Sequence, residues 1–356
     1  MSTGVSSRLA RVDFGRRVLV LRRWRIAVRI DWRSLIVCTA LAVAVACTAV
    51  LALMTGSYQL NPAQVISALA GGENGLVQDI VVEWRLPRVA AALVFGAALG
   101  VSGAVFQSML RNPLADPGIV GFSQGSYTGA LIVILVINGT YAQLVGGALL
   151  GGLGTAIAVY VLAYRQGVQG FRLIVVGIGM SAMLGSLNTW LILRADLEVA
   201  MAAAVWGAGS LNGVSWHQVA IGGAAIGVLL LLAAMLSRPM RQLELGDDAA
   251  ASQGVRVSPV RLGLVIVGVA LTATVTAATG PIAFISLVAP QIARRLARTA
   301  GITLVPAAIV GALLCLAADY IAQHIAPTPL PVGIVTVILG GGYLGWLLFV
   351  EARKRL

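Results

Sequence analysis

Residues 89–129 read VAAALVFGAALGVSGAVFQSMLRNPLADPGIVGFSQGSYTG. An apolar run opens the stretch, a polar corner with two prolines interrupts it, and small residues resume after the corner. The run does not alternate between polar and apolar residues, and a helix of about 20 apolar residues crosses the hydrocarbon core of a bilayer. The stretch therefore predicts two membrane helices joined by a short turn.

The composition extends this interpretation to the whole chain. Of the 356 residues, 59% are hydrophobic and 11% are charged, whereas a soluble domain carries about 25% charged residues. Lipid offers the backbone no hydrogen-bond partners, and the absence of period-2 alternation favours helices over a barrel. We predict an all-α polytopic membrane protein with a transmembrane domain at 34–350 and about ten spans, at 34–54, 89–109, 117–137, 142–163, 172–193, 218–236, 261–279, 281–293, 303–318 and 332–350. The run at 281–293 is too short to cross upright, so a tilted, broken or partly re-entrant route is expected there.

Basic residues set the predicted orientation. Ten spans place both termini on one side, and with the N-terminus inside only Arg85, Arg88 and Arg194 of the 25 basic residues fall in outer loops. Nine arginines lie in a cytoplasmic arm at 1–33, which is expected to contact anionic lipid, and a basic tail follows at 351–356. Nucleic-acid binding is not favoured, because no motif accompanies the net charge of +12.

The ionisable residues argue against transport that is driven by protons, by sodium or by ATP bound to this chain. All 13 acids lie in loops or at span ends, with Asp116 and Asp319 nearest the membrane, so no proton or sodium relay is predicted. Lys354 is the only lysine, so no phosphate-binding loop is present. No catalytic group or metal site stands out, and an ATPase that drives uphill transport is expected to be another chain.

Two further features leave alternatives open. Glycines recur every four residues at 96/100, 121/125/129 and 147/151, a spacing typical of close helix packing within the chain, with a subunit seam or the lining of a pathway as alternatives. The long inner loop 237–260 predicts a short helix that starts at Asp247 and Asp248 and has Gly254 at the C′ position. That helix is either a partner contact or an ordinary connector.

Four segments, in this order, resemble one known family. They are WRLPRVAAALVFGAALGVSGAVFQSMLRNPLADPGIVGFSQG at 84–125, SRPMRQLELGDDAAASQGV at 237–255, GPIAFISLVAPQIARRL at 280–296 and LPVGIVTVILGGGYLGWLL at 330–348. The family comprises the membrane permeases of ABC importers for iron–siderophores, haem and vitamin B12. The resemblance implies a type II importer permease, with a second permease subunit beside it, an ATPase dimer below and a substrate-binding protein above.

The resemblance also implies roles for individual residues. Arg85 and Arg88 match the outer arginines that meet glutamates on the binding protein, although local neutralisation by Glu83 and Asp79 is the alternative. The loop helix matches the coupling helix that seats in the ATPase, with candidate contacts Leu245, Gly246, Asp247, Asp248, Gln253 and Gly254. ATP and Mg²⁺ would then bind the partner ATPase, and this chain would need no cofactor or metal.

The polar corner at 111–118 matches the family's turn between the second and third spans, on the cytoplasmic side. Pro113 and Pro117 stop continuous helix, and Asp116 is expected at the N-terminal end of the next helix, where its charge suits the dipole. Candidates for the translocation pathway are Gln107, Asn112, Ser123, Gln124, Tyr127, Pro290 and Gln291. For Ser123, Gln124 and Tyr127 the alternative is hydrogen bonding between helices.

Two departures from the family pattern affect the expected assembly. Gln291 stands where many members have histidine, and Gln323 stands where a third outer arginine falls. Such changes resemble the second permease subunit of ferric-enterobactin-type systems, so we expect a heterodimer in a bacterial plasma membrane, with both termini cytoplasmic. The expected cargo is an iron–siderophore, with haem or cobalamin as alternatives. A passive channel or secondary transporter is less favoured, because the coupling-helix pattern argues against it.

Overall fold

The computed structural model describes residues 18–23, 26–72, 75–118, 120–137, 139–163, 170–299 and 301–355. Within these residues each predicted span coincides with a helix, and the chain is all-α apart from one β-hairpin. The helices at the predicted spans are α1 (Trp32–Met54), α4 (Leu86–Leu110), α5 (Phe122–Ile132), α6 (Tyr141–Ala163), α7 (Gly170–Arg194), α9 (Trp216–Leu243), α11 (Val257–Thr279), α12 (Ile285–Ala297), α13 (Leu304–His324) and α14 (Val332–Arg355).

Helix length separates these elements into two groups. Seven helical stretches among the described residues are long and apolar enough to cross a membrane. Helix α5 is shorter, although the π-helix η2 (Val133–Ile137) extends it, and α12 has 13 residues and a length of about 20 Å. Helix α14 continues to Arg355, through most of the predicted basic tail at 351–356.

Several smaller elements were not predicted. Strands β1 (Val18–Arg23) and β2 (Ile26–Asp31) form an antiparallel hairpin in the predicted arm, of which 1–17 and 24–25 lie outside the described residues. The other elements are α2 (Pro62–Leu69), α3 (Leu76–Gln78), η1 (Asp79–Arg85, a π-helix), α8 (Leu197–Gly207) and α10 (Asp247–Ser252). Helix α2 begins with a capping box between Asn61 and Gln64, and Pro62 suits its first turn.

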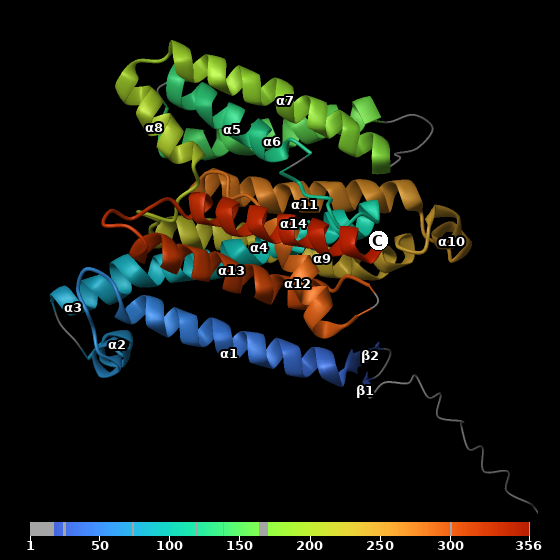
Figure 1. Cartoon of the computed structure of the whole chain (residues 1–356), viewed down its shortest axis with the longest axis horizontal. Helices are drawn as coiled ribbons and strands as arrows, with labels where there is room; N and C mark the ends of the chain where they lie inside the picture. The colour runs from blue at the N-terminus through green and yellow to red at the C-terminus, as the bar shows by residue number, and fades with distance from the viewer. Residues whose placement is uncertain are drawn as a thin grey trace, which may run out of the picture.

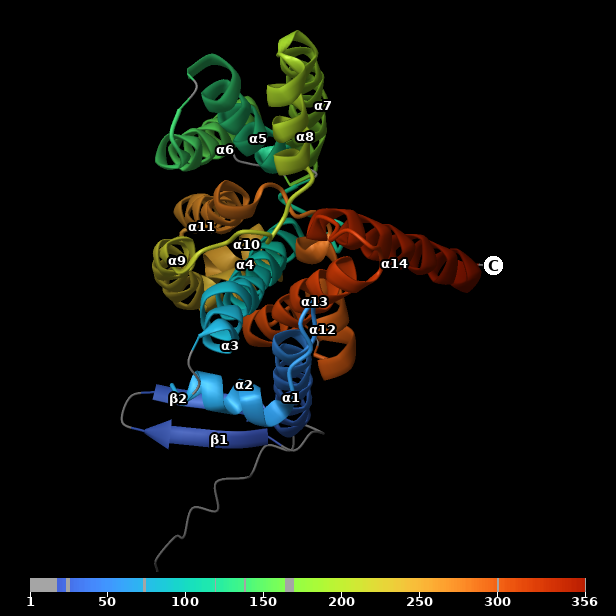
Figure 2. The ribbon, with the colours of Figure 1, turned by 90° about the vertical axis from the view of Figure 1, so that its left-hand side faces the viewer.

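The helices form three groups along one bundle (Figure 1). Helices α5 to α8 lie along the top, α4, α9, α11 and α13 occupy the middle, and α1 runs along the lower edge. The hairpin, α10 and the C-terminal end lie toward one end of the bundle, while α2, α3 and α8 lie toward the other. Helix α4 is deeply buried and contacts α9, α11, α12 and α13, whereas α14 leans away from the bundle (Figure 2).

Glycines bring helix backbones together, as the four-residue spacing predicts. Gly96 and Gly100 of α4 pack against the backbone of α13 at Gly311, where an added side chain would overlap the facing carbonyl oxygens. Gly129 of α5 meets Gly147 of α6 in the same way. At these positions the spacing serves packing within the chain, because lipid supplies no hydrophobic drive between helices and close backbone contact replaces it.

The corner after α4 differs from its prediction. Arg111 ends α4 with a left-handed φ of 50°, and α5 begins only at Phe122, five residues beyond the predicted start of the span at 117. The intervening chain is buried at Ala115, Asp116 and Val120. It extends back into the bundle as far as Ser286, which packs against Gly103 of α4. Such irregular backbone is tolerated at this depth because protein surrounds it.

The short eighth helix agrees with its prediction. Helix α12 begins at Ile285, after the non-helical residues 280–284, and Phe284 before it has a φ of 67°. Since Ser286 packs against Gly103, α12 starts inside the bundle and not at its outer end. The route is therefore broken: residues 280–284 carry the chain inward before the helix resumes.

Candidate functional site

A cavity of about 520 Å³ lies between α5, α11, α12 and α14. Ser123 and Gln124 of α5 line it, as the pathway prediction proposed, together with Ser286 of α12. Ala208, which follows α8, and Gly333, at the start of α14, form its outer end. Most of the remaining wall is apolar, with Ile282, Phe284, Leu287, Ile334, Val337 and Ile338.

Asp116 is the charged residue among those that line this cavity. Its carboxylate accepts hydrogen bonds from the Ser286 hydroxyl and, at 3.0 Å, from the Gly118 amide. The prediction that Asp116 caps the next helix is therefore wrong, because α5 starts at Phe122 and the carboxylate binds the first turn of α12 instead. The bonds fasten the broken segment after α4 to α12.

Gln107 and Gln291 lie outside the cavity wall. The Gln291 amide donates to Gln107 Oε1 at 2.7 Å and to the Pro113 carbonyl at 3.0 Å. The Gln107 amide in turn donates to the Leu287 carbonyl at 2.8 Å. Both glutamines and Pro290 are buried, so this structure gives them a role in joining α4, α12 and the corner.

Gln124 and Tyr127 also form hydrogen bonds with neighbouring helices. Gln124 Oε1 accepts a hydrogen bond from Asn188 of α7 at 3.1 Å. The Tyr127 hydroxyl donates to the Ala203 carbonyl of α8 at 3.1 Å, and the Tyr127 ring stacks on Trp206 at 5.8 Å between centroids. Tyr127 fits the helix-contact alternative, while Gln124 both lines the cavity and binds α7.

The end of the bundle near α10, called the inner end after the predicted orientation, carries a second, smaller cavity of about 220 Å³. Gln107, Asn112, Arg111, Glu244 and Arg294 line it. Asn112 also accepts a hydrogen bond from the Leu114 amide at 2.9 Å, which shapes the turn after α4. These contacts place Asn112 at the inner face and not in the larger cavity.

Helix α10 lies beside this smaller cavity. Gly246 precedes it with a φ of 113°, and Gly254 follows at C′ with a φ of 84°, as the sequence predicted. The Val255 amide donates to the Ala250 carbonyl at 3.0 Å, which completes a Schellman motif. The predicted coupling residues divide by exposure, because Leu245, Asp248, Gln253 and Gly254 are exposed while Gly246 and Asp247 are half-buried.

Asp247 makes an ion pair instead of the predicted helix cap. Its Oδ1 lies 2.7 Å from Arg261 Nη2 of α11 and 3.9 Å from Arg111 Nη2 at the end of α4. Next to it, the Ser108 hydroxyl of α4 donates to Glu244 Oε1 at 2.5 Å. Helix α10 is thus tied to both α4 and α11.

At the outer end, Arg85 binds neutral acceptors. Its Nη1 donates to the Leu53 carbonyl at 2.7 Å and its Nη2 to the Tyr58 carbonyl at 2.6 Å. Glu83 and Asp79 were the alternative partners, but no carboxylate among the described residues lies within ion-pair distance of Arg85. The part of the chain that the structure describes therefore gives Arg85 no compensating carboxylate.

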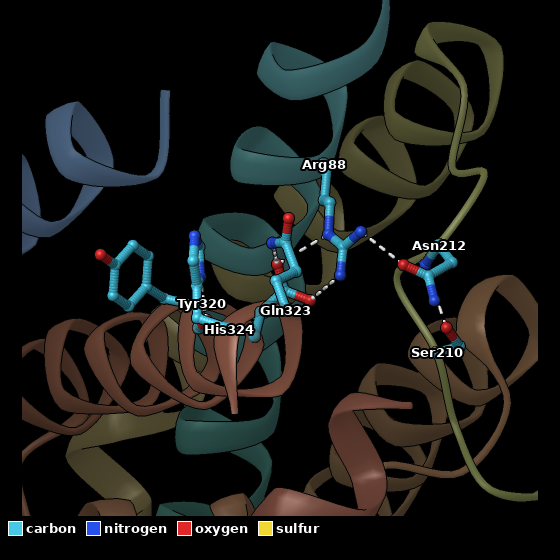
Figure 3. A network of polar contacts seen from close by, with 7 residues as sticks. Arg88, Ser210, Asn212, Tyr320, Gln323 and His324 are labelled. Carbon is cyan, nitrogen blue, oxygen red and sulfur yellow. Dashed lines mark hydrogen bonds and ion pairs between the residues drawn. The ribbon is translucent and has the colours of Figure 1, made fainter. Parts of the chain in front are cut away.

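Arg88 is bound very differently (Figure 3). Its Nε and Nη2 donate to the two carboxylate oxygens of Asp319 on α13, each at 2.8 Å. Its Nη1 donates to Asn212 Oδ1, which belongs to the segment between α8 and α9. Gln323 donates to Asp319 Oδ2 at 2.9 Å and so supports this pair.

Comparison with known proteins identifies the family. The model of the FecCD transport family matches residues 40–350. The chain belongs to the FecCD transport family. It is therefore a multi-pass membrane permease subunit, in agreement with the fold and the resemblance seen in the sequence.

Individual FecCD proteins are similar over nearly their full lengths. The chain is 48% identical to the ferric enterobactin transport system permease protein FepG of Escherichia coli, over 91% of this chain and 98% of that protein. It is 35% identical to the iron(3+)-hydroxamate import system permease protein FhuG of Bacillus subtilis, over 84% and 92% of the two chains. A solved structure of an inward-facing metal-chelate type ABC transporter matches with a TM-score of 0.77 at 26% identity, over 89% of this chain and 99% of that one.

The residues that sequence reasoning missed are the partners of Arg88 and Asp116. Asn212 and Ser286 carried no signal, because each is an ordinary polar residue in a loop or a first turn. Asp319 did carry one, as an acid close to the membrane, since a carboxylate there requires a partner. Its partner lies 231 residues away in the chain, which no local pattern could supply.

Proposed function

We propose that this chain is the permease subunit of an ATP-driven importer that moves iron–siderophore complexes into the bacterial cytoplasm. It would receive the complex from an extracytoplasmic binding protein and work with an ABC ATPase dimer. The observation that carries this proposal is the 48% identity to a ferric enterobactin permease over 98% of that protein. The chemistry of the cargo stays unchanged in this scheme, and ATP hydrolysis belongs to the partner.

The larger cavity supports passage of a bulky chelate. Its wall is mostly apolar, and Asp116 is engaged by Ser286 and the Gly118 amide. Charges near mid-membrane cost about 2.5–3.5 kcal/mol each on insertion scales, so a weakly polar wall is favourable for the membrane fold. The same wall gives a large chelate many weak contacts and no single strong binding site.

The residues at the two ends of the bundle support contact with a binding protein at one end and an ATPase at the other. At the outer end, Arg85 and Arg88 would meet acidic groups of the binding protein, and Arg85 carries an uncompensated charge. At the inner end, the exposed Asp248 of α10 and the exposed Leu245 and Gln253 on either side of this helix would contact the ATPase. The β1–β2 hairpin and the C-terminal end of α14 lie toward the α10 end, as expected if that end is cytoplasmic (Figure 1).

The second permease subunit would pack against α14. This helix leans away from the bundle, and its exposed apolar residues include Ile338, Leu339 and Phe349 (Figure 2). Val337 and Ile338 of the same helix line the larger cavity. A homologous subunit on this face would therefore enclose the cavity between the two permeases and bury the exposed side chains.

Uptake of radioactive iron tests the proposal. Cells that lack this chain, and the same cells complemented with it, are offered a panel of iron-loaded siderophores, with haem and cobalamin alongside. We expect loss of uptake confined to an iron chelate, restored by the complementing copy. Loss of haem or cobalamin uptake alone would contradict the cargo, and unchanged uptake of every compound would contradict the importer function.

A further inference from the structure

At the outer end, Arg88 makes one strong interaction, with Asp319, and one weaker interaction, with Asn212. The pair of Arg88 with Asp319 is bidentate, and Asp319 is 2% exposed while Arg88 is 16% exposed. Asn212, in contrast, is exposed and offers Arg88 a neutral amide oxygen. The Arg88 guanidinium carries its charge in both links, but a carboxylate attracts it with a full negative charge, whereas an amide oxygen carries only a partial one. An incoming carboxylate would therefore displace Asn212 from Arg88 before it displaces Asp319.

Asn212 is connected to the wall of the larger cavity through its own backbone. The Asn212 amide donates to the Ser210 hydroxyl at 3.0 Å, and the Ser210 amide donates to the Thr279 carbonyl at the end of α11 at 2.7 Å. One residue earlier, Gly209 accepts from the Gly333 amide of α14 at 3.0 Å. The segment 208–215 therefore bridges the outer ends of α11 and α14.

The bridge is tightly packed. A side chain on Gly209 would overlap the Pro281 carbonyl, and one on Gly333 would overlap the Ala208 carbonyl. Ala208, Pro281 and Gly333 all line the larger cavity at this end. Any shift of segment 208–215 must consequently move part of the cavity wall, because close-packed backbone cannot deform without moving its neighbours.

We propose that the Arg88–Asn212 hydrogen bond is a latch that holds segment 208–215 over the outer end of the larger cavity. A carboxylate of the binding protein releases the latch by replacing Asn212 at Arg88 Nη1. Asp319 is a positioning residue in this scheme, because its two oxygens keep the guanidinium group in place during the exchange (Figure 3). The inference rests on the docking role proposed for Arg88.

The latch assigns different tasks to the two outer arginines. Arg85 is bound to carbonyl groups near the end of α1 and supplies attraction without touching segment 208–215. Arg88 converts the arrival of an acidic group into release of Asn212. Docking and opening are then linked by a single guanidinium group.

Substitutions at Asn212 test the latch, since this side chain is exposed and its loss does not threaten the core. Asn212→Ala removes the latch, whereas Asn212→Asp supplies a permanent carboxylate to Arg88. Asn61→Asp, at the cap of α2, is the matched control, because it adds a carboxylate at the outer end away from Arg88. Each variant also carries Ala208→Cys, with Cys38 and Cys47 changed to serine.

Two quantities are measured on the full importer in nanodiscs. The first is the affinity for the purified binding protein of the same system, and the second is the rate at which a membrane-impermeant thiol reagent modifies Cys at position 208. With wild-type Asn212, addition of the binding protein is expected to raise the rate. Asn212→Ala should show the higher labelling rate even without the binding protein. Asn212→Asp should show the low labelling rate with and without the binding protein, and should bind that protein about tenfold more weakly.

The outcomes separate the latch from docking itself. If the binding protein binds normally but neither Asn212 substitution changes affinity or labelling relative to Asn61→Asp, the latch is wrong and docking stands. If the binding protein does not bind the parent importer, the docking role and the latch both fail. If Asn212→Asp binds as tightly as the parent, exchange of carboxylate for amide is excluded.

Discussion

The two ends of the bundle each hold an arginine–aspartate pair, and the pairs differ in burial. At the outer end, Asp319 is 2% exposed and joins α13 to Arg88 of α4. At the inner end, Asp247 is 42% exposed and joins α10 to Arg261 of α11, with Arg111 further away. The outer pair is shielded from solvent, whereas water reaches the inner carboxylate.

This difference indicates which end is rigid and which can adjust. Breaking a buried pair from one side leaves an uncompensated charge in a low dielectric, while an exposed pair is replaced by water at little cost. The outer pair is therefore a fixed anchor, and movement there is expected in the Asn212 link. The inner pair could lengthen or exchange if α10 contacts the ATPase as proposed.

Asp319→Ala should have the largest effect on stability. It leaves Arg88 mostly buried without its carboxylate, and the expected loss is about 3–5 kcal/mol in the free energy of unfolding. Thermal unfolding of the purified permease measures it. Asp196→Ala, an exposed acid at the same end, is the control. Equal melting temperatures in the two variants would remove the distinction between the two ends.

Gly246→Val should disturb the inner end next. The residue has φ 113° and ψ 157°, a region that only glycine adopts readily, so valine costs about 1–3 kcal/mol locally. We expect α10 to lose its position and the ATPase to co-purify poorly. Gly227→Val in α9, where an added side chain meets open space, is the control. Normal recovery of the ATPase with Gly246→Val would argue against α10 as the contact.

Arg85→Glu isolates docking from the outer anchor. Reversal of Arg88 would place a carboxylate against Asp319 and confuse docking with stability, whereas Arg85 touches only carbonyl groups. Uptake is expected to fall about tenfold, equivalent to 1.4 kcal/mol of lost binding free energy. Arg194→Glu, an exposed outer arginine on α7, controls for net charge. Similar uptake in both variants would contradict a docking role for Arg85.

Asp247→Ala should have the smallest effect on stability. The Asp247 carboxylate is 42% exposed, so water can take its place beside Arg261, although the Arg261 side chain itself is only 9% exposed. The expected loss is about 1 kcal/mol, smaller than for Asp319→Ala, because Asp319 is buried on its own side of the pair as well. Its effect should appear in coupling, as more ATP hydrolysed for each cargo molecule imported, because α10 loses its tie to α11. Asp247→Glu keeps a carboxylate near Arg261, so it is expected to retain the parent's number of ATP molecules hydrolysed for each cargo molecule. A destabilisation as large as that of Asp319→Ala would show that the two ends are equally rigid.

The spans were predictable because each depends on local composition. Apolar runs located each helix, with ends that differ from the predicted spans by up to seven residues. The short run at 281–293 left tilted, broken and re-entrant routes open, and α12 shows the broken one. The four-residue glycine spacing predicted close helix packing, as Gly96 and Gly100 show against α13. At Gly254 the prediction of the C′ position was also correct. These features repeat within a few turns of one chain segment, so a sequence contains them.

The corner after α4 was predicted only in part. Pro113 and Pro117 correctly indicated an interruption, since neither can continue a helix. Their position did not reveal that the chain turns back into the bundle, because that path depends on the bond between Asp116 and Ser286, 170 residues away. Candidate pathway residues divided accordingly: Ser123 and Gln124 line the cavity, while Gln107 and Gln291 are buried beside it.

The sequence alone determined the class of molecule, its membrane spans, its charge asymmetry and its likeness to one transport family. Only the tertiary structure decided what the two outer arginines do. They lie three residues apart and look equivalent, yet Arg85 ends a π-helix and faces the end of α1, while Arg88 lies in α4 and faces α13. The reason is physical: periodicity and hydropathy are local, whereas a charge acquires its partner from whichever helix the packing places beside it.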